Sequence, residues 1–284
     1  MRILITACNG QLGTDAVTYF SKENEVVAYK DIELDITDEL MVTAAVRDSK
    51  PDLIINTAAI TNVDGCEANE ELAHNVNAHG AGVVAKAAEN TNAVLAHIST
   101  DYVFDGTKTT PYIETDETCP KNVYGRSKLE GENKVLENCS RSFIFRTAWL
   151  YGPHGNNFVK TMLKIGSVKG EVDVVTDQTG NPTSTFELLR IIDSAIKSKN
   201  YGIYHATCEG ACSWNTFARE IFRVAKLNVK VNNITSEKML RPAFRPAFSV
   251  LSKQKLFECF GYRPASWQQA LQEYFEYLNG TVSF

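Results

Sequence analysis

The feature that most restricts the possible folds is a regular alternation of short apolar runs and longer amphipathic stretches in the first half of the chain. The apolar runs have the length and composition of buried strands, and they cover residues 2–6, 25–29, 52–56, 93–99 and 142–147. Four stretches between them have helical length and spacing: 11–22, 38–48, 70–90 and 122–138. Because right-handed crossovers place helices on both faces of a parallel sheet, this pattern predicts an α/β protein with a Rossmann-type doubly wound parallel sheet.

The second half of the chain, after about Trp149, follows a less regular pattern. Turn-forming residues mark loops at 151–155 and 180–182, and helical patterns cover 183–199, 213–225 and 266–278. Residues 202–206 again have the composition of a strand. We therefore expect two interleaved units: a core of residues 1–150 plus about 184–207, and a smaller C-terminal lobe of residues 151–183 plus about 208–284.

Composition excludes several classes of protein. The net charge of −5, without a dense Lys/Arg run, predicts no nucleic-acid partner. The apolar run at the N-terminus is too short for a membrane span or a signal segment, so we expect a cytoplasmic protein without membrane contact. The seven cysteines are scattered and form no C-x-x-C pair, so the sequence predicts reduced thiols and no metal site.

A glycine-rich turn follows the first predicted strand. Gly10 and Gly13 lie where a helix begins, and the free N–H groups of a helix N-terminus attract phosphate. Two glycines three residues apart are weak evidence, and an ordinary strand-to-helix connection is the alternative. Ala7 also stands where the full dinucleotide-binding pattern has its first glycine.

Tyr124 and Lys128 are four residues apart in a predicted helix, so their side chains share one face. An adjacent ammonium favours the phenolate, so we expect Lys128 to lower the pKa of Tyr124 and to let the phenol protonate a carbonyl oxygen. Thr100 lies at the carboxyl end of a predicted strand, where ligands bind in open α/β sheets, and its hydroxyl could bond the same oxygen. A Tyr and a Lys with this spacing are usually incidental, and the combination with Thr100 and the glycine turn is what carries the inference.

Together these motifs resemble the extended branch of the short-chain dehydrogenase/reductase superfamily, and within it the dTDP-4-dehydrorhamnose reductase family. The similar segments cover nearly the whole chain: residues 9–13, 34–37, 56–59, 99–104, 124–132, 146–152, 177–183 and 245–246. Two positions depart from the family pattern, namely Ala7 and Ile60. The resemblance implies reduction of the 4-keto group of dTDP-4-dehydro-L-rhamnose to dTDP-L-rhamnose by NADPH or NADH, in surface-polysaccharide biosynthesis.

The resemblance also implies roles for individual residues. The catalytic set would be Thr100, Tyr124 and Lys128, with Lys128 also holding the nicotinamide ribose. The cofactor would meet Gly10, Gln11, Leu12, Asp35, Ile36, Ala58, Ala59, Thr61, Tyr124 and Lys128. The sugar nucleotide would meet Thr100, Asp101, Trp149, Asn157 and Arg245. In this scheme the core binds NAD(P) and the lobe binds the substrate.

Several alternatives stay open from the sequence. Lys30 and Asp31 offer a cation for a 2′-phosphate and an acid for a 2′-hydroxyl, so the preference for NADPH is slight. Asp101-Tyr102 after Thr100 argues against a dehydratase, which would have Asp-Glu there. Two other functions remain open. The protein could be a reductase of another keto-deoxysugar nucleotide, or a non-catalytic subunit like the regulatory subunit of methionine adenosyltransferase. The chain could be a monomer or a homodimer, and Mg²⁺ is possible but unsupported, since Asp15 and Glu187 are expected at the solvated surface.

Overall fold

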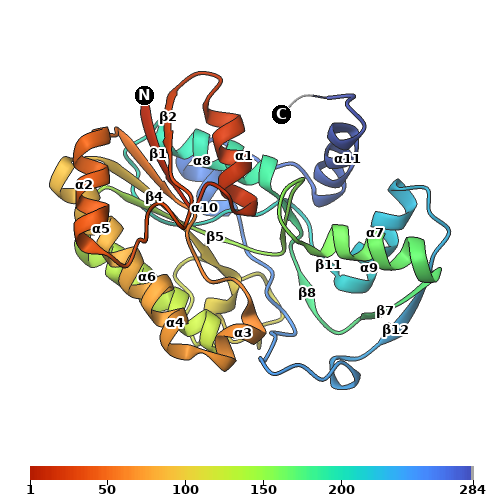
Figure 1. The fold of residues 1–284 in the computed structure, drawn as a ribbon. Coiled ribbons are helices and arrows are strands. Elements are labelled where there is room, and N and C mark those ends of the chain that lie inside the picture. The colour runs from red at the N-terminus through yellow and green to blue at the C-terminus, as the bar shows by residue number, and fades with distance from the viewer. Residues whose placement is uncertain (283–284) are drawn as a thin grey trace.

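The computed structural model describes residues 1–282, and its centre is a six-stranded sheet in which every neighbouring pair is parallel. The strand order is β10-β5-β4-β3-β1-β2 (Figure 1). The strands are β1 (Arg2–Thr6), β2 (Glu25–Ala28), β3 (Leu53–Asn56), β4 (Val94–Thr100), β5 (Ser142–Thr147) and β10 (Gly202–His205). This order confirms the predicted doubly wound fold, and it sets the carboxyl ends of β1, β3, β4 and β5 along one edge.

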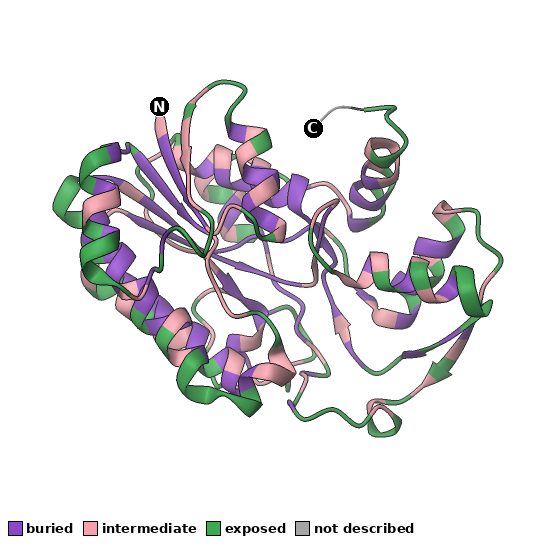
Figure 2. Cartoon of the chain, viewed as in Figure 1, coloured by how far each residue is buried: buried purple, intermediate pink, exposed green. Residues whose placement is uncertain are grey.

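Helices cover both faces of the sheet, because the inner strands β1, β3, β4 and β5 are largely buried on both sides (Figure 2). One face packs against α1 (Gln11–Phe20), α8 (Thr185–Ile196) and α10 (Gln254–Phe260). The other face packs against α2 (Glu39–Ser49), α5 (Ala81–Thr91) and α6 (Val123–Asn138). Asp38 caps α2, with its side chain accepting from the backbone of Leu40 and Met41.

The stretch 70–90, expected as one helix, consists of three segments in the structure. These are α4 (Glu70–His74), the π-helical segment η1 (Asn75–Gly80) and α5. A further short helix, α3 (Val63–Ala68), was not predicted. The wide turns of η1 accompany a buried Asn77, whose side chain bonds a loop at the edge of the sheet. A π segment inside a helix is frequent at functional sites.

The second lobe has its own apolar cluster. The lobe contains the helices α7 (Phe158–Lys169), α9 (Trp214–Val224) and α11 (Trp267–Leu278). It also contains the parallel strands β7 (Glu171–Val175) and β12 (Lys230–Ile234). Two shorter pairs join β6 (Leu150–Tyr151) to β9 (Thr183–Ser184) and β8 (Thr179–Gly180) to β11 (Cys212–Ser213). The 3-10 helices η2 (Asp101–Val103) and η3 (Ser236–Lys238) complete the elements.

One element differs from the expected division between core and lobe. Helix α10 lies in the part of the sequence assigned to the lobe, yet Leu256 and Phe260 pack in the apolar cluster beneath the sheet. On α11, Trp267, Leu271 and Tyr274 are buried, whereas Leu278 is exposed. Across residues 1–282, no helix is long and apolar enough to cross a membrane.

Candidate active site

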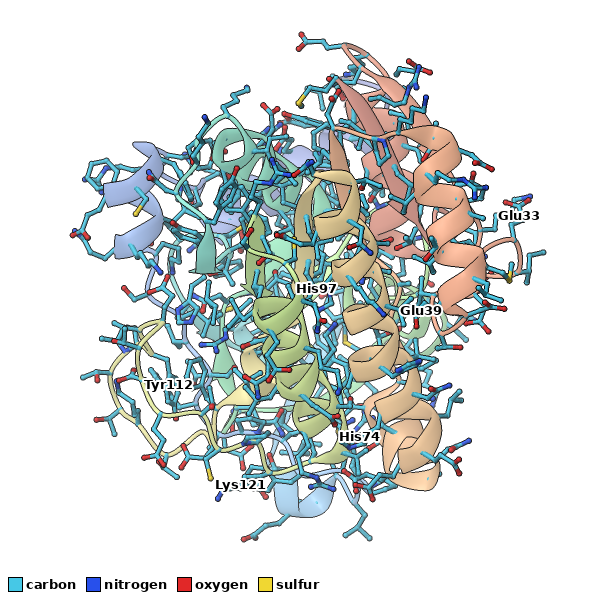
Figure 3. The ribbon with its side chains drawn as sticks, turned by 90° about the vertical axis from the view of Figure 1, so that its left-hand side faces the viewer. Glu33, Glu39, His74, His97, Tyr112 and Lys121 are labelled. Atoms are coloured by element: carbon cyan, nitrogen blue, oxygen red, sulfur yellow. The ribbon has the colours of Figure 1, made fainter. Side chains whose placement is uncertain are left out.

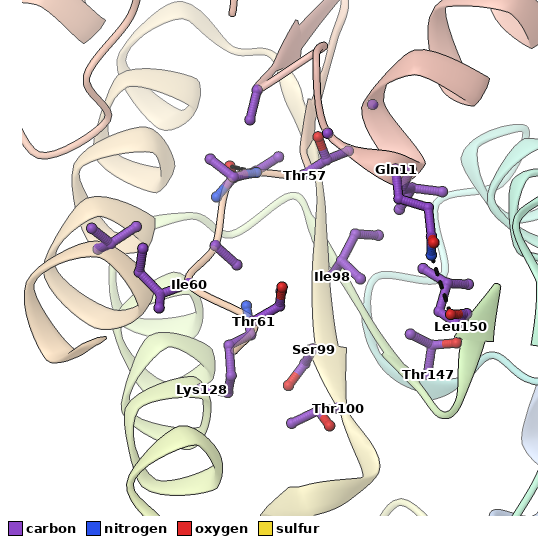
Figure 4. A pocket seen from close by; sticks show the side chains of 18 of the residues that line it. Gln11, Thr57, Ile60, Thr61, Ile98, Ser99, Thr100, Lys128, Thr147 and Leu150 are labelled. Carbon is purple, nitrogen blue, oxygen red and sulfur yellow. Dashed lines mark hydrogen bonds between the residues drawn. The ribbon is translucent and has the colours of Figure 1, made fainter. Parts of the chain in front are cut away.

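A cavity of about 850 Å³ opens where the carboxyl ends of the strands meet the second lobe (Figure 4). All the expected cofactor residues line it: Gly10, Gln11, Leu12, Asp35, Ile36, Ala58, Ala59, Thr61, Tyr124 and Lys128. Thr100, Asp101 and Trp149 line the same cavity. The structure therefore brings these residues together, and their individual roles stay predictions.

The turn between β1 and α1 is tight. Ala7 has a positive φ of 47°, a conformation that favours glycine, and its carbonyl oxygen accepts the Gly10 N–H at 2.9 Å. A β-carbon on Gly13 would overlap that carbonyl oxygen, so α1 can lie this close to β1 only with glycine there. The N-terminus of α1 has no side-chain cap and faces the cavity. Such free N–H groups favour a phosphate.

The residues after β2 close one end of the cavity. Asn9 and Asp31 exchange two hydrogen bonds: Asn9 Nδ2 donates to Asp31 Oδ1 at 2.9 Å, and Asp31 N donates to Asn9 Oδ1 at 3.2 Å. Asp31 lines the cavity, while the Lys30 ammonium pairs with Glu33 at 3.5 Å. Of the two residues considered as contacts of the adenosine ribose, Lys30 and Asp31, it is therefore Asp31 that faces the cavity.

The loop after β3 forms the wall opposite the glycine turn, and buried Asn77 holds it. Asn77 Oδ1 accepts from Ile60 N at 2.8 Å, and Asn77 Nδ2 donates to Ile60 O at 3.0 Å and to Ser127 Oγ at 3.0 Å. The Ile60 side chain packs beside Tyr124 in a small apolar cluster. Ile60, one of the two departures from the family pattern, is therefore part of the apolar surroundings of the Tyr124 ring.

Tyr124 and Lys128 lie on one face of α6, opposite the end of β4 that carries Thr100. Figure 4 shows Lys128 between its helix and the end of β4 that carries Ser99 and Thr100. The helix begins at a cap where Asn122 Oδ1 accepts Gly125 N at 2.6 Å, and a β-carbon on Gly125 would overlap the carbonyl oxygen of Tyr102. The cap and the close approach fix the height of both side chains above the sheet.

Thr100 is also fixed by its neighbours. Its hydroxyl donates to Asp101 Oδ1 at 3.0 Å and accepts from Tyr102 N at 3.2 Å. Burial raises the pKa of the Asp101 carboxyl to about 6, although hydrogen bonds from Ser249 and Thr100 offset part of the rise. A carboxyl with this pKa is still largely ionised at neutral pH and can accept from Thr100.

The pKa expected for Tyr124 was wrong. Burial raises the pKa of its phenol well above the usual value, and the Thr100 hydroxyl offsets only part of this rise. Lys128 is itself buried, which lowers the pKa of its amine to about 8 even though Glu132 favours the charged form. The physical reason is that desolvation penalises the charged form of both groups and outweighs their proximity on the helix.

Two expected substrate residues lie outside this cavity. Arg245 lines a second cavity of about 560 Å³, which shares Tyr102 and Trp214 with the first. Its guanidinium donates two hydrogen bonds of 3.0 Å to the Asp64 carboxylate. Asn157 caps α7 and donates to Gln11 Oε1 at 3.0 Å, so it orders the loop beside the glycine turn while its neighbour Asn156 lines the cavity.

Three residues of the site were missed in the sequence. Trp214 stacks on Trp149, with ring centroids 3.5 Å apart and planes 7° apart, at the junction of the two cavities. Asp64 holds Arg245, and His97 lies under Lys128. None of the three carried a local signal, because each meets its partner only through the tertiary fold.

The acidic residues considered for Mg²⁺ are buried, contrary to expectation. Asp15 Oδ1 lies 2.5 Å from His154 Nδ1, and Glu187 Oε1 accepts from Tyr262 at 2.7 Å and from Ala265 N at 3.0 Å. Among residues 1–282, the structure contains no group of three or more side chains able to hold a metal ion.

Comparison with known proteins places the chain in a family. The family model described as the RmlD substrate binding domain matches residues 1–279. The dTDP-4-dehydrorhamnose reductase of Aggregatibacter actinomycetemcomitans is 41% identical, over 95% of this chain and 97% of that protein.

Two solved structures are similar over nearly their whole length. A dTDP-4-dehydrorhamnose reductase of Clostridium acetobutylicum has 46% sequence identity and a TM-score of 0.95, covering 98% of this chain and 100% of the other. That of Bacillus anthracis, in complex with NADP, has 39% identity and a TM-score of 0.95, covering 96% and 98%. The chain therefore belongs to the dTDP-4-dehydrorhamnose reductase family, as its sequence motifs indicated.

Proposed function

We propose that the protein reduces the 4-keto group of dTDP-4-dehydro-L-rhamnose to dTDP-L-rhamnose with hydride from NADPH or NADH. The observation that carries the proposal is the convergence of Thr100, Tyr124 and Lys128 on the cavity that also receives the glycine turn. Relatives that are named dTDP-4-dehydrorhamnose reductase, one of them with NADP bound, support the same reaction.

The cavity fits a dinucleotide. Gly13 leaves no room for a side chain beside Ala7, and the uncapped N-terminus of α1 would receive the pyrophosphate. Asp35 and Ile36 would line the adenine, and Lys128 would bond the nicotinamide ribose. When bound, the nicotinamide supplies the hydride.

Tyr124 is the proton donor in this proposal. Its raised pKa keeps the phenol protonated at neutral pH, and the alkoxide that develops on a reduced carbonyl is a stronger base than a phenolate. The proton therefore passes from the Tyr124 hydroxyl to the oxygen of C4. Thr100 steadies that oxygen through its hydroxyl, which must turn from Asp101 to do so.

The second cavity would hold the rest of the sugar nucleotide. Arg245 supplies a cation there, and the Trp149–Trp214 stack forms an apolar wall where the cavities meet. We propose that the core of the chain binds the cofactor and that the lobe, including the segment that carries Arg245, binds the dTDP-sugar. Asp101 is buried and its carboxylate accepts a hydrogen bond from Thr100. We therefore do not assign it the role of the acid that a dehydratase needs to eliminate water.

The test is the loss of NADPH absorbance when the purified protein meets dTDP-4-dehydro-L-rhamnose made in situ, with NADH in parallel. Oxidation that depends on the sugar nucleotide is expected, and its rate with each nucleotide ranks the two cofactors. Cofactor binding without any oxidation would contradict the proposal and favour a different keto-sugar or a non-catalytic binding subunit.

A further inference from the structure

A row of buried polar side chains runs below the candidate site from β1 to α6. Thr6 Oγ1 donates to Asn56 Oδ1 at 2.7 Å, and Asn56 Nδ2 lies 3.2 Å from His97 Nδ1. His97 Nε2 lies 3.5 Å from Lys128 Nζ. All four side chains are buried, and Figure 3 labels His97 in the view onto α5 and α6. Buried polar groups are costly without partners, so each link constrains the next.

Backbone donors fix the direction of these bonds at Asn56. Ala58 N donates to Asn56 Oδ1 at 3.3 Å, and the Thr6 hydroxyl donates to the same oxygen while accepting from Thr57 N at 3.2 Å. The amide oxygen of Asn56 must therefore lie on this side, with its NH₂ group toward His97. Nδ1 of His97 then accepts a hydrogen bond, and a neutral imidazole carries its proton on Nε2.

The His97 ring is neutral for a clear reason. Burial and the neighbouring Lys128 amine keep its pKa well below the usual value. Its Nε2–H consequently faces Lys128 Nζ. An ammonium has only donors, whereas a neutral amine can accept this N–H. Within residues 1–282, His97 Nε2 is the one polar atom within hydrogen-bond distance of Lys128 Nζ.

We propose that His97 is a positioning residue that directs an N–H at Lys128 Nζ and leaves the ammonium form of Lys128 dependent on acceptors from the bound nicotinamide ribose. The inference rests on the proposed function, because the ribose belongs to the cofactor. No proton passes through His97 in this arrangement. The cofactor and a proton on Lys128 then favour each other's binding.

The other titratable groups around this part of α6 do not supply the missing acceptor. The Glu132 carboxylate favours the charged amine, but it accepts from Arg146 at 2.9 and 2.7 Å and from Ser99 at 2.5 Å. Asp101 on η2 and Cys66 on α3 act on Tyr124 of the same helix, and His74 of α4 pairs with Glu130.

The experiment measures the dissociation constant of NADPH by its fluorescence from pH 6 to 10. In the native protein the affinity should fall as pH rises, with a midpoint near the pKa of Lys128, which is about 8. In His97→Leu no N–H faces Lys128 Nζ, so the bond that favours the neutral amine is lost. The midpoint of this variant should move up by about half a unit or more, because a factor of three in proton affinity accompanies one such bond.

His205→Leu is the matched control. His205 is a buried histidine on β10, two strands away from β4 in the sheet, and it makes no hydrogen bond to Lys128. It should cost a similar amount of stability and leave the midpoint unchanged. A midpoint that moves equally in both variants would overturn the proposal, since the effect would then be general loosening of the sheet.

Asn56→Asp tests the same row of hydrogen bonds if His97→Leu does not fold. A carboxylate facing Nδ1 requires the proton on that atom, so Nε2 becomes an acceptor and the midpoint should also rise. In Asn56→Asp/His97→Leu the midpoint should rise no further than in His97→Leu. A further rise would trace the effect of Asn56→Asp to its charge alone and would overturn the proposal, as would unchanged midpoints in the folded single variants. The proposed function fails separately, if the native protein binds NADPH with this pH dependence yet reduces no keto-sugar.

Discussion

At Ala7 the chain holds a side chain in a backbone conformation that favours glycine. Its φ of 47° lies in the left-handed region, and its carbonyl oxygen contacts both Gly10 and the position of Gly13. Residues of this kind store strain that the surrounding structure must offset. The turn still forms, because β1 and α1 are both anchored in the apolar cluster beneath the sheet.

We expect Ala7→Gly to stabilise the protein. Relief of the left-handed conformation is worth about 1–2 kcal/mol, and the greater freedom of glycine in the unfolded chain returns about 0.4–1 kcal/mol of it. The free energy of unfolding, measured by denaturant titration, should rise by about 0.5–1 kcal/mol. Ala45→Gly in the middle of α2 should lower it instead, by about 1 kcal/mol. Equal losses in the two variants would mean that Ala7 is not strained.

Tyr124→Phe separates chemistry from binding at the residue scale. The substitution removes the phenolic proton and keeps the ring against Ile60 and Cys66. Turnover with the keto-sugar nucleotide should fall by about 100-fold or more, because proton transfer by a positioned side chain contributes about 10² to 10⁴. NADPH affinity should change little. Turnover close to that of the native protein would remove Tyr124 from the mechanism.

At the scale of elements, periodicity predicted the strands because each is a short, continuous apolar run. Periodicity did not predict the division of residues 70–90, because a π segment has nearly the same apolar spacing as an α-helix. What sets this segment apart is the buried polar residue Asn77, whose partners are distant in the sequence. The partners of Asn77, namely Ile60 and Ser127, lie 17 and 50 residues away. Helix α3 was missed because six residues are too few for a helical period to stand out.

Asn77→Ala should loosen the loop after β3. The substitution leaves the N–H and the carbonyl of Ile60 without their partners, and an unsatisfied buried polar group costs about 1–3 kcal/mol. We expect a lower free energy of unfolding and faster hydrogen exchange at residues 57–61, together with weaker NADPH binding. Asn138→Ala, at the end of α6 and far from the cavity, should leave loop exchange unchanged. Protection at 57–61 that equals that of the native protein would show that other contacts hold the loop.

At the scale of the whole molecule, most of the cavity next to the core was predictable, and the part facing the lobe was not. Cofactor-side residues follow strands in sequence, so strand order alone brings them to one edge. The lobe side depends on contacts between distant segments, such as Trp149 with Trp214 and Asp64 with Arg245. Arg245 was predicted at the substrate and lies at the second cavity, but its carboxylate partner could not be inferred from spacing.

Asp64 joins the core to the lobe, and this link should depend on pH. Its carboxylate, on α3, accepts from Arg245, Arg241 and the backbone of Ala243. The hydrogen bond from Arg245 is the main reason that the pKa of Asp64 falls from 3.8 to about 2. Because the folded pKa lies below the unfolded one, the link stabilises the fold fully above about pH 4, and this stabilisation is lost as pH falls toward 2.

Asp64→Asn should therefore lower the melting temperature at pH 7 and flatten its decline between pH 4 and 2, since the amide has no proton to gain. Asp48→Asn, at an exposed pair with Arg47 on α2, is the control and should leave both features unchanged, because exposed pairs contribute little. Scanning calorimetry at several pH values measures both. If Asp64→Asn keeps the native slope below pH 4, other carboxylates dominate the acid response. The core and the lobe would then be joined mainly by their other contacts, such as those of Asp15 with His154, Glu187 with Tyr262 and Asn122 with the carbonyl of Phe244.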